Sequence, residues 1–186
     1  SDRVWVPLDV KSSSALSIYH GYELIKKFEE KVIPEFPVSW PRKVAFDLQF
    51  SSGGFINNAF YMGDSDVTVI LPYESGGLPI AFNSGILVHE HFHAHFHKMV
   101  GKQVAAKLGH YFESDQIKSV QSHLHGENVR PNCGLPNYPR SKVNSDDDDF
   151  RRLVNFYIFR GWNEGLADLY AALVTGNTNF FDQSLN

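Results

Sequence analysis

The N-terminal part of the chain alternates between strand-like and helix-like spacing of apolar residues. Residues 4–10 alternate apolar and polar side chains, which predicts a strand. From residue 12 to residue 33 apolar positions recur every three or four residues, which predicts an amphipathic helix that ends before Pro34. The side chains expected to face inward from this helix are Leu16, Tyr19, Leu24, Ile25, Phe28 and Val32.

Three further stretches predict a small sheet. Residues 43–50 place an apolar side chain at every second position, which is typical of a half-buried strand. Residues 55–62 and 67–71 flank the turn-forming segment 63–66 and predict an antiparallel pair. The order of elements predicts an α+β fold, in which a small mixed or antiparallel sheet precedes a metal-binding helix and a mainly helical C-terminal part.

Histidine occupies every second position from residue 89 to residue 97. In a strand all these rings would lie on one face, as in a histidine-rich metal-binding tract. The flanks instead favour a helix of about 17 residues, because Asn83 suits its start and Gly101 suits its end. In that helix His91 and His95 fall opposite the other histidines, so we expect these two to face solvent or pack rather than bind metal.

His89, Glu90 and His93 form the pattern His-Glu-x-x-His. In a helix the two histidines lie one turn apart on one face, so both rings can bind one metal ion. Zinc held in this way lowers the pKa of a bound water to about 7, and Glu90 is placed to take its proton. The pattern therefore supplies two ligands and a general base, and leaves a third ligand to be found.

A candidate third ligand lies in residues 161–171, which read as a helix with an apolar face. Glu164 and Asp168 are four residues apart and share one side of that helix. Glu164 would complete a zinc site of two histidines and one glutamate, and Asp168 would accept the free ring N–H of a ligand histidine. The alternative is that both are acids on a solvated helix face.

Together these motifs resemble those of the gluzincin metallopeptidases, the group that includes thermolysin and the aminopeptidase-N-like enzymes. The arrangement of Asn163, Glu164 and Asp168 is similar to the second motif of the thermolysin type. The sequence of residues 162–165 is closer to that of the aminopeptidase branch. Residues 58–61 resemble the edge-strand segment that pairs with substrate backbone in thermolysin-like enzymes. The interval between the two metal motifs is far longer than in either branch, which indicates an insertion over approximately residues 101–148.

The resemblance covers roughly residues 43–175 and implies a zincin-like zinc metallopeptidase that cleaves a peptide or protein substrate. We expect residues 1–186 to form this one catalytic domain. With Glu90 as general base, we expect backbone groups of Asn58 and Ala59 to hold an extended substrate by strand addition. A developing oxyanion needs a further donor, for which Tyr157, seven residues before Glu164, is preferred. The other donors left open for this role are Tyr170, His110, His123 and His125.

Composition bears on the number of domains, on nucleic-acid and membrane binding, and on disulfide bonds. A chain of 186 residues with 42% hydrophobic content makes one compact domain. A net charge of −4 gives no electrostatic case for nucleic acid, and no apolar run is long enough to span a bilayer. The single cysteine, Cys133, excludes an intrachain disulfide. We expect a secreted or periplasmic location over a cytoplasmic one.

Two functions of other classes stay open. One is a catalytically silent zinc-binding domain that binds a protein partner, against which the presence of Glu90 argues. The other is a histidine-rich metal-binding module, which would bind several metal ions weakly and without Glu164. The aspartate run at residues 146–149 reads as the solvated start of a helix, with a calcium site as the alternative.

Overall fold

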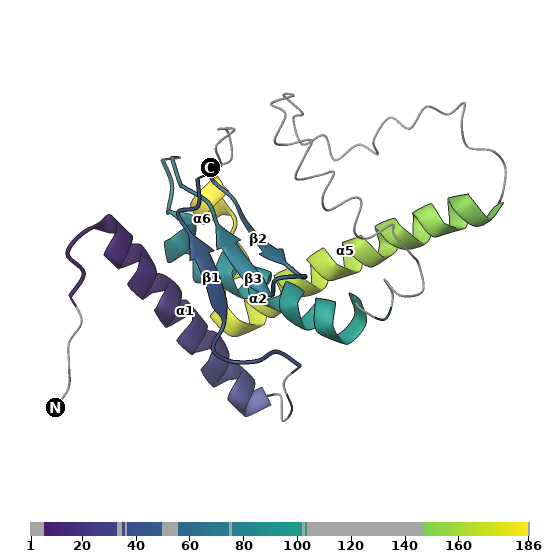
Figure 1. Cartoon of the computed structure of the whole chain (residues 1–186), viewed down its shortest axis with the longest axis horizontal. Coiled ribbons are helices and arrows are strands. Elements are labelled where there is room, and N and C mark those ends of the chain that lie inside the picture. Colours follow the sequence, from purple (N-terminus) through teal and green to yellow (C-terminus); the bar gives the residue numbers. More distant parts are fainter. Residues whose placement is uncertain are drawn as a thin grey trace.

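The structure is a computed structural model that describes residues 6–32, 35, 37–49, 56–74, 76–101, 103 and 147–185. Within these ranges long helices stand beside one small sheet (Figure 1). The helices are α1 (Val10–Val32), α2 (Ser84–Phe96), α5 (Asp147–Thr175) and the short α6 (Asp182–Leu185). The strands are β1 (Lys43–Phe46), β2 (Ala59–Met62) and β3 (Val67–Ile70), and two short helical turns are η1 (Ile80–Phe82) and η2 (His97–Gly101). The predicted α+β class is confirmed, and most of the expected insertion lies outside the described residues.

Helix α1 begins earlier than the sequence predicted. The Asp9 side chain accepts a hydrogen bond from the backbone N–H of Ser12 at 2.7 Å, and Ser12 Oγ accepts one from the N–H of Asp9 at 3.0 Å. This reciprocal capping starts the helix at Val10, so the strand predicted over residues 4–10 is wrong for its described part, residues 6–10. The predicted inward face is right at Ile25, but Tyr19 and Val32 are exposed.

The sheet has the strand order β1-β3-β2, with β1 parallel and β2 antiparallel to β3. The antiparallel pair around residues 63–66 was predicted, but two strands are shorter than expected. Asp47 adopts a φ of 56° and ends β1, and Asn57 adopts a φ of 56° and delays the start of β2. Left-handed backbone cannot continue an extended ladder, and Asp and Asn are the residues that tolerate it after glycine.

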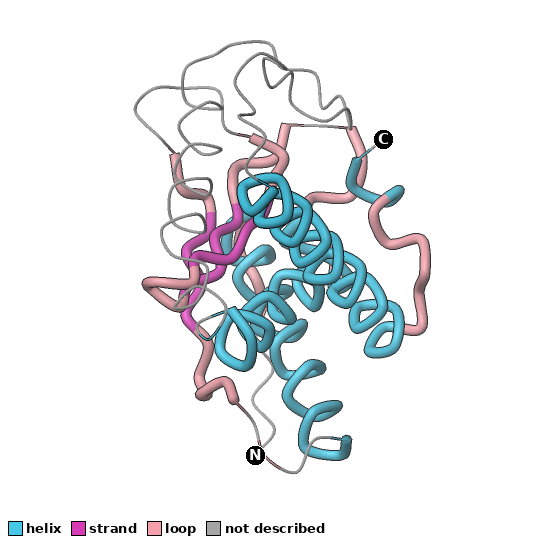
Figure 2. The backbone as a smooth tube through the Cα atoms, turned by 90° about the vertical axis from the view of Figure 1, so that its right-hand side faces the viewer, coloured by secondary structure: helices cyan, strands magenta, loops and turns pink. Residues whose placement is uncertain are grey.

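Helix α2 packs against β2, and α1 packs against α2 and η1. Figure 2 shows the helices gathered on one side of the small sheet. The Tyr22 hydroxyl on α1 donates a hydrogen bond to Thr68 on β3 at 2.9 Å, which shows the face of the strand that meets the helix. Ile70 on the same face joins a buried cluster with Ile25 and Leu87. The core therefore sits where α1, α2 and β3 meet.

The described C-terminal segment holds the start of α2. Asn83 caps α2 by accepting from the N–H of Ile86, and its amide donates to the carbonyl of Phe180 at 2.7 Å and to Ser184 at 2.9 Å. At Gly85 the backbone of α2 lies so close to Phe180 that a Cβ at this position would be 2.3 Å from that side chain. Glycine is therefore the residue that fits here. Helix α2 and the turn η2 that continues it together span the helix predicted from Asn83 to Gly101.

Helices α2 and α5 run against each other along much of α2 (Figure 1). Ala94 on α2 and Ala167 and Ala171 on α5 are fully buried. Small side chains let two helices approach closely, so polar groups that flank these alanines meet across the interface. This contact brings residues of the two sequence motifs together.

Candidate metal centre

The first metal motif and the second one converge at the contact of α2 with α5. His89, His93 and Glu164 each offer a ligand atom, and these three atoms lie within 4.8 Å of one another. The Nε2 atoms of His89 and His93 are 3.1 Å apart, and Glu164 Oε2 lies 3.3 Å from the first and 3.6 Å from the second. The structure thus contains a His/Glu group that could bind a metal ion.

These separations fit a single tetrahedral ion. Ligand atoms that each lie about 2.0–2.1 Å from a tetrahedral zinc are about 3.3 Å from one another. The three observed edges, between 3.1 and 3.6 Å, bracket that value. The side chains of His89 and His93 are 7% and 13% exposed, whereas that of Glu164 is 50% exposed, so the group is open to solvent on one side.

Both histidines have an acceptor for their other ring nitrogen. His89 Nδ1 lies 2.8 Å from Asp168 Oδ1, and His93 Nδ1 lies 3.0 Å from Asn163 Oδ1. An Nδ1–H bonded in this way leaves the lone pair of Nε2 directed at the shared point. The sequence left open which histidine Asp168 would meet, and it did not assign Asn163 a role.

The carboxylates set the charge of this group. Burial acts to lower the pKa of His89, but the nearby carboxylates of Glu164 and Glu90 outweigh it and raise that pKa. The pKa of His93 is lowered, chiefly by burial, and that of Glu164 is lowered, chiefly by its hydrogen bond with His89. The three converging ligand atoms and these carboxylates could hold a cation.

Glu90 is buried beside the ligands, between them and strand β2. Burial raises the pKa of Glu90 to about 8, and the charges of His89 and Glu164 and the backbone N–H of Tyr61 also act on it. The carboxyl group is therefore in the electrostatic field of the ligands and next to the edge strand. A nearby divalent cation would lower this pKa and favour the carboxylate.

Strand β2 is the edge strand of the described sheet on the side away from β1. The N–H of Leu71 on the β3 side donates to the carbonyl of Asn58 at 2.9 Å, so Asn58 faces β3. Because residues alternate along an antiparallel pair, the carbonyls of Ala59 and Tyr61 point to the free edge. The Asn58 side chain accepts from the N–H of Ala59 at 2.9 Å, which leaves the Ala59 carbonyl as the group best placed to accept a hydrogen bond.

The other predicted site residues are less well placed or lie elsewhere. Tyr157 is partly buried on α5, on the same side as Glu164 but two turns away, about 10 Å along the axis at 1.5 Å per residue. Tyr170 donates its hydroxyl hydrogen to Glu29 at 2.9 Å, away from the His89 group. His110, His123 and His125 lie outside the described residues, as does the side-chain structure of the aspartate run that begins α5.

His91 and His95 are buried, with exposures of 0% and 4%, so of the two expected alternatives packing is right and solvent exposure is wrong. Each approaches Glu29, a fully buried residue of α1 that the sequence reading did not single out. A carboxylate at an inward position of α1 is invisible to a search for apolar spacing. The available signal in the sequence was the second i, i+4 histidine pair, His91 and His95.

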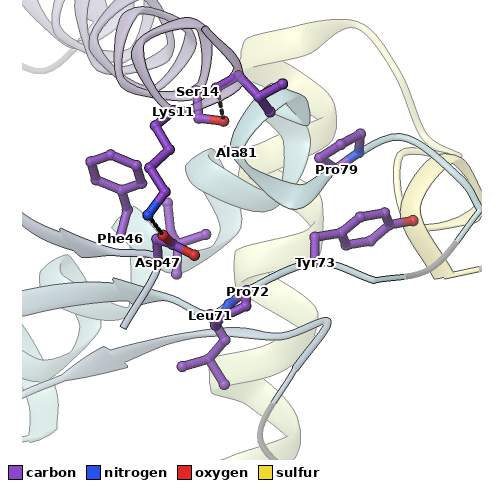
Figure 3. Close-up of a pocket in the computed structure, with 11 residues that line it drawn as sticks. Lys11, Ser14, Phe46, Asp47, Leu71, Pro72, Tyr73, Pro79 and Ala81 are labelled. Atoms are coloured by element: carbon purple, nitrogen blue, oxygen red, sulfur yellow. Dashed lines mark hydrogen bonds and ion pairs between the residues drawn. The ribbon is translucent and has the colours of Figure 1, made fainter. Parts of the chain in front are cut away.

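A separate hollow of about 260 Å³ lies at the start of α1 and contains none of the His89 group (Figure 3). Lys11 and Asp47 form an ion pair of 2.6 Å across it. The residues that line it are Val10, Lys11, Ser14, Phe46, Asp47, Ile70, Leu71, Pro72, Tyr73, Pro79 and Ala81. Its walls offer one ion pair, and neither candidate metal-binding group of the described residues lines it.

No protein-family model matches this chain, and neither curated proteins nor solved structures gave a match. No helix within the described ranges qualifies as a membrane span. Function must therefore be argued from the geometry of the site.

Proposed function

We propose that this protein is a zinc-dependent metallopeptidase with the zincin-like organisation that its motifs resemble. The observation that carries the proposal is the triangle of His89, His93 and Glu164, whose edges of 3.1 to 3.6 Å suit one tetrahedral zinc. Two further features support it. Each histidine has an acceptor on its other nitrogen, and one side of the group is open to solvent.

The roles of the residues follow from their positions. His89, His93 and Glu164 would hold the zinc, which when bound would supply Lewis acidity toward water and a substrate carbonyl. Glu90 accepts the proton of the attacking water and returns it to the leaving amine, for which a buried carboxylate beside the ligands is suited. Asp168 and Asn163 keep the two rings in the tautomer that binds metal.

The free edge of β2 suits an extended peptide. The outward carbonyl of Ala59 would accept a backbone N–H from a substrate that adds as a further strand next to Glu90. The expectation that the Asn58 backbone binds substrate is wrong for its carbonyl, which is bonded to Leu71. Its side-chain oxygen accepts from the N–H of Ala59, so Asn58 would contribute through its side-chain NH₂ group. Such pairing recognises backbone, so it favours peptides and proteins over small esters or amides.

The test is Glu90→Gln, with the exposed Glu30→Gln on α1 as matched control. Glu90→Gln keeps the side-chain shape and removes the base, so we expect zinc content and far-UV circular dichroism to be unchanged while peptide hydrolysis falls about 10²-fold or more. The control should match the parent. Zinc is measured by elemental analysis and activity with a fluorogenic peptide library.

Several results would contradict the proposal. Undiminished hydrolysis by Glu90→Gln would remove Glu90 from the chemistry. One bound zinc with no hydrolysis by the parent would point to a silent zinc-binding domain. Several weakly bound ions that are unaffected by Glu164→Ala would point to a histidine-rich module.

A further inference from the structure

A second group of converging ligands lies on the opposite face of α2. His91 Nε2 and His95 Nε2 lie 2.8 Å and 2.5 Å from Glu29 Oε1. Glu29 comes from α1 and is fully buried, and the histidines are 0% and 4% exposed. Neither the motifs nor the proposed mechanism uses any of these three side chains.

The second histidine pair has the same ring arrangement as the first. The Nε2 atoms of His91 and His95 are 3.2 Å apart and their rings are 4.9 Å apart at 83°. In the His89 and His93 pair the corresponding values are 3.1 Å, 4.7 Å and 89°. Helix α2 therefore directs two ring nitrogens at one point on each of its two sides.

The surroundings of Glu29 leave its charge to be balanced by these histidines or by an ion. Within the described residues its ion-pair partners are His91 and His95, and neither a lysine nor an arginine is paired with it. Tyr170 donates to Oε1 at 2.9 Å and Trp40 donates to Oε2 at 3.3 Å. Buried carboxylates require compensation, and a carboxylate that binds metal is itself commonly hydrogen-bonded by such neighbours.

We propose that Glu29, His91 and His95 form a second metal site, which holds a divalent first-row transition ion between α1 and α2. Two imidazoles and a carboxylate are a ligand set that suits zinc. Because all three side chains are buried, no substrate could reach the ion, and its role would be structural. It would tie α1 to the helix that carries His89 and His93.

The fit has two consequences that can be measured. The Nε2 atoms of His91 and His95 lie closer to Glu29 Oε1 than the about 3.3 Å that separates two ligand atoms of one tetrahedral zinc. To bind the ion, the Glu29 carboxylate must therefore move back by several tenths of an ångström. Oε2 can then serve as the fourth ligand atom. His91 Nδ1 has no hydrogen-bond partner in the described structure, unlike Nδ1 of His89 and His93. Loss of such a partner typically weakens affinity about 10- to 100-fold, so the second ion should bind more weakly than the first.

The test is zinc stoichiometry in the whole chain, refolded with excess zinc so that burial does not limit entry, and then dialysed against a zinc-buffered solution. The parent should retain two zinc ions, Glu29→Gln one, and His89→Ala one. The matched control His20→Ala, an exposed histidine of α1, should retain two. In the His89→Ala background zinc should still raise the melting temperature, because the remaining ion would stabilise the fold.

The outcomes separate this proposal from the proposed function. If the parent retains one zinc and Glu29→Gln also retains one, the second site does not exist, whatever the activity. If Glu29→Gln loses one ion and His89→Ala loses none, the second site stands and the proposed catalytic site fails. If Glu29→Gln does not fold, His95→Gln replaces it, and a zinc content of His95→Gln equal to that of the parent overturns the proposal.

Discussion

The hydrogen bond between Asp168 and His89 allows the strength of the proposed metal centre to be tested quantitatively. Asp168→Ala removes the carboxylate oxygen that lies 2.8 Å from His89 Nδ1. Loss of such a partner typically weakens metal binding about 10- to 100-fold, which corresponds to about 1.4 to 2.7 kcal/mol. The Asp168 side chain is 52% exposed, so water can take over as acceptor. We therefore expect a loss near the lower end, about tenfold.

The assay is competition for zinc with a chromophoric chelator at fixed pH. Asp168→Asn keeps an acceptor oxygen and should recover most of the affinity, and Asp64→Ala, which removes an exposed acid of the β2–β3 turn, is the charge-matched control. A chelator curve for Asp168→Ala that overlays the parent would show that the contact has no part in binding. Complete loss of zinc would equally refute the reasoning, because it would make Asp168 a ligand.

Two further predictions concern the scaffold. Gly85→Ala places a Cβ 2.3 Å from Phe180, so we expect denaturant unfolding to show a loss of about 1–3 kcal/mol, and an unchanged midpoint would mean that α2 does not approach the C-terminal segment so closely. Partial burial would raise the pKa of Asp66, but hydrogen bonds from Arg42 and Lys98 outweigh it and hold the pKa well below the ordinary 3.8. The ionised Asp66 therefore stabilises the fold at pH values above its ordinary pKa, and this stabilisation is lost as the pH falls through the lower pKa of the folded state. Asp66→Asn should be less stable than the parent at pH 7, and the difference should shrink in acid. A difference independent of pH would contradict this.

The local chemistry of the candidate site was readable from the sequence because its ligands are close neighbours on helices. His89 and His93, and likewise Glu164 and Asp168, are one turn apart, so helical spacing alone puts each pair on one side. That the two pairs meet depends on the close packing of α2 and α5 over buried alanines. No periodicity specifies such a contact between distant segments.

Prediction from the sequence failed at positions where a polar residue is buried or where its backbone conformation ends a strand. Glu29 belongs to the buried side of α1, although a search for apolar residues assigns that side to Tyr19 and Val32, which are exposed. Asp47 and Asn57 end the ladders through left-handed backbone, a choice that spacing does not encode. Both features depend on tertiary structure. They determine where strands β1 and β2 end and which residues meet the His91 and His95 face of α2.

The bonds between the start of α2 and the C-terminal segment bear on the order in which the molecule matures during synthesis. Partners in the candidate metal centre are 70 to 79 residues apart, and Asn83 is held by groups 97 to 101 residues further along the chain. A ribosome delivers the chain from its N-terminus, and contacts of such long range close only after both partners have emerged. Helix α2 would wait, with its histidines exposed, until α5 and residues 180–184 arrive. Metal capture at the candidate centre is therefore expected only after residues 180–184 have been synthesised.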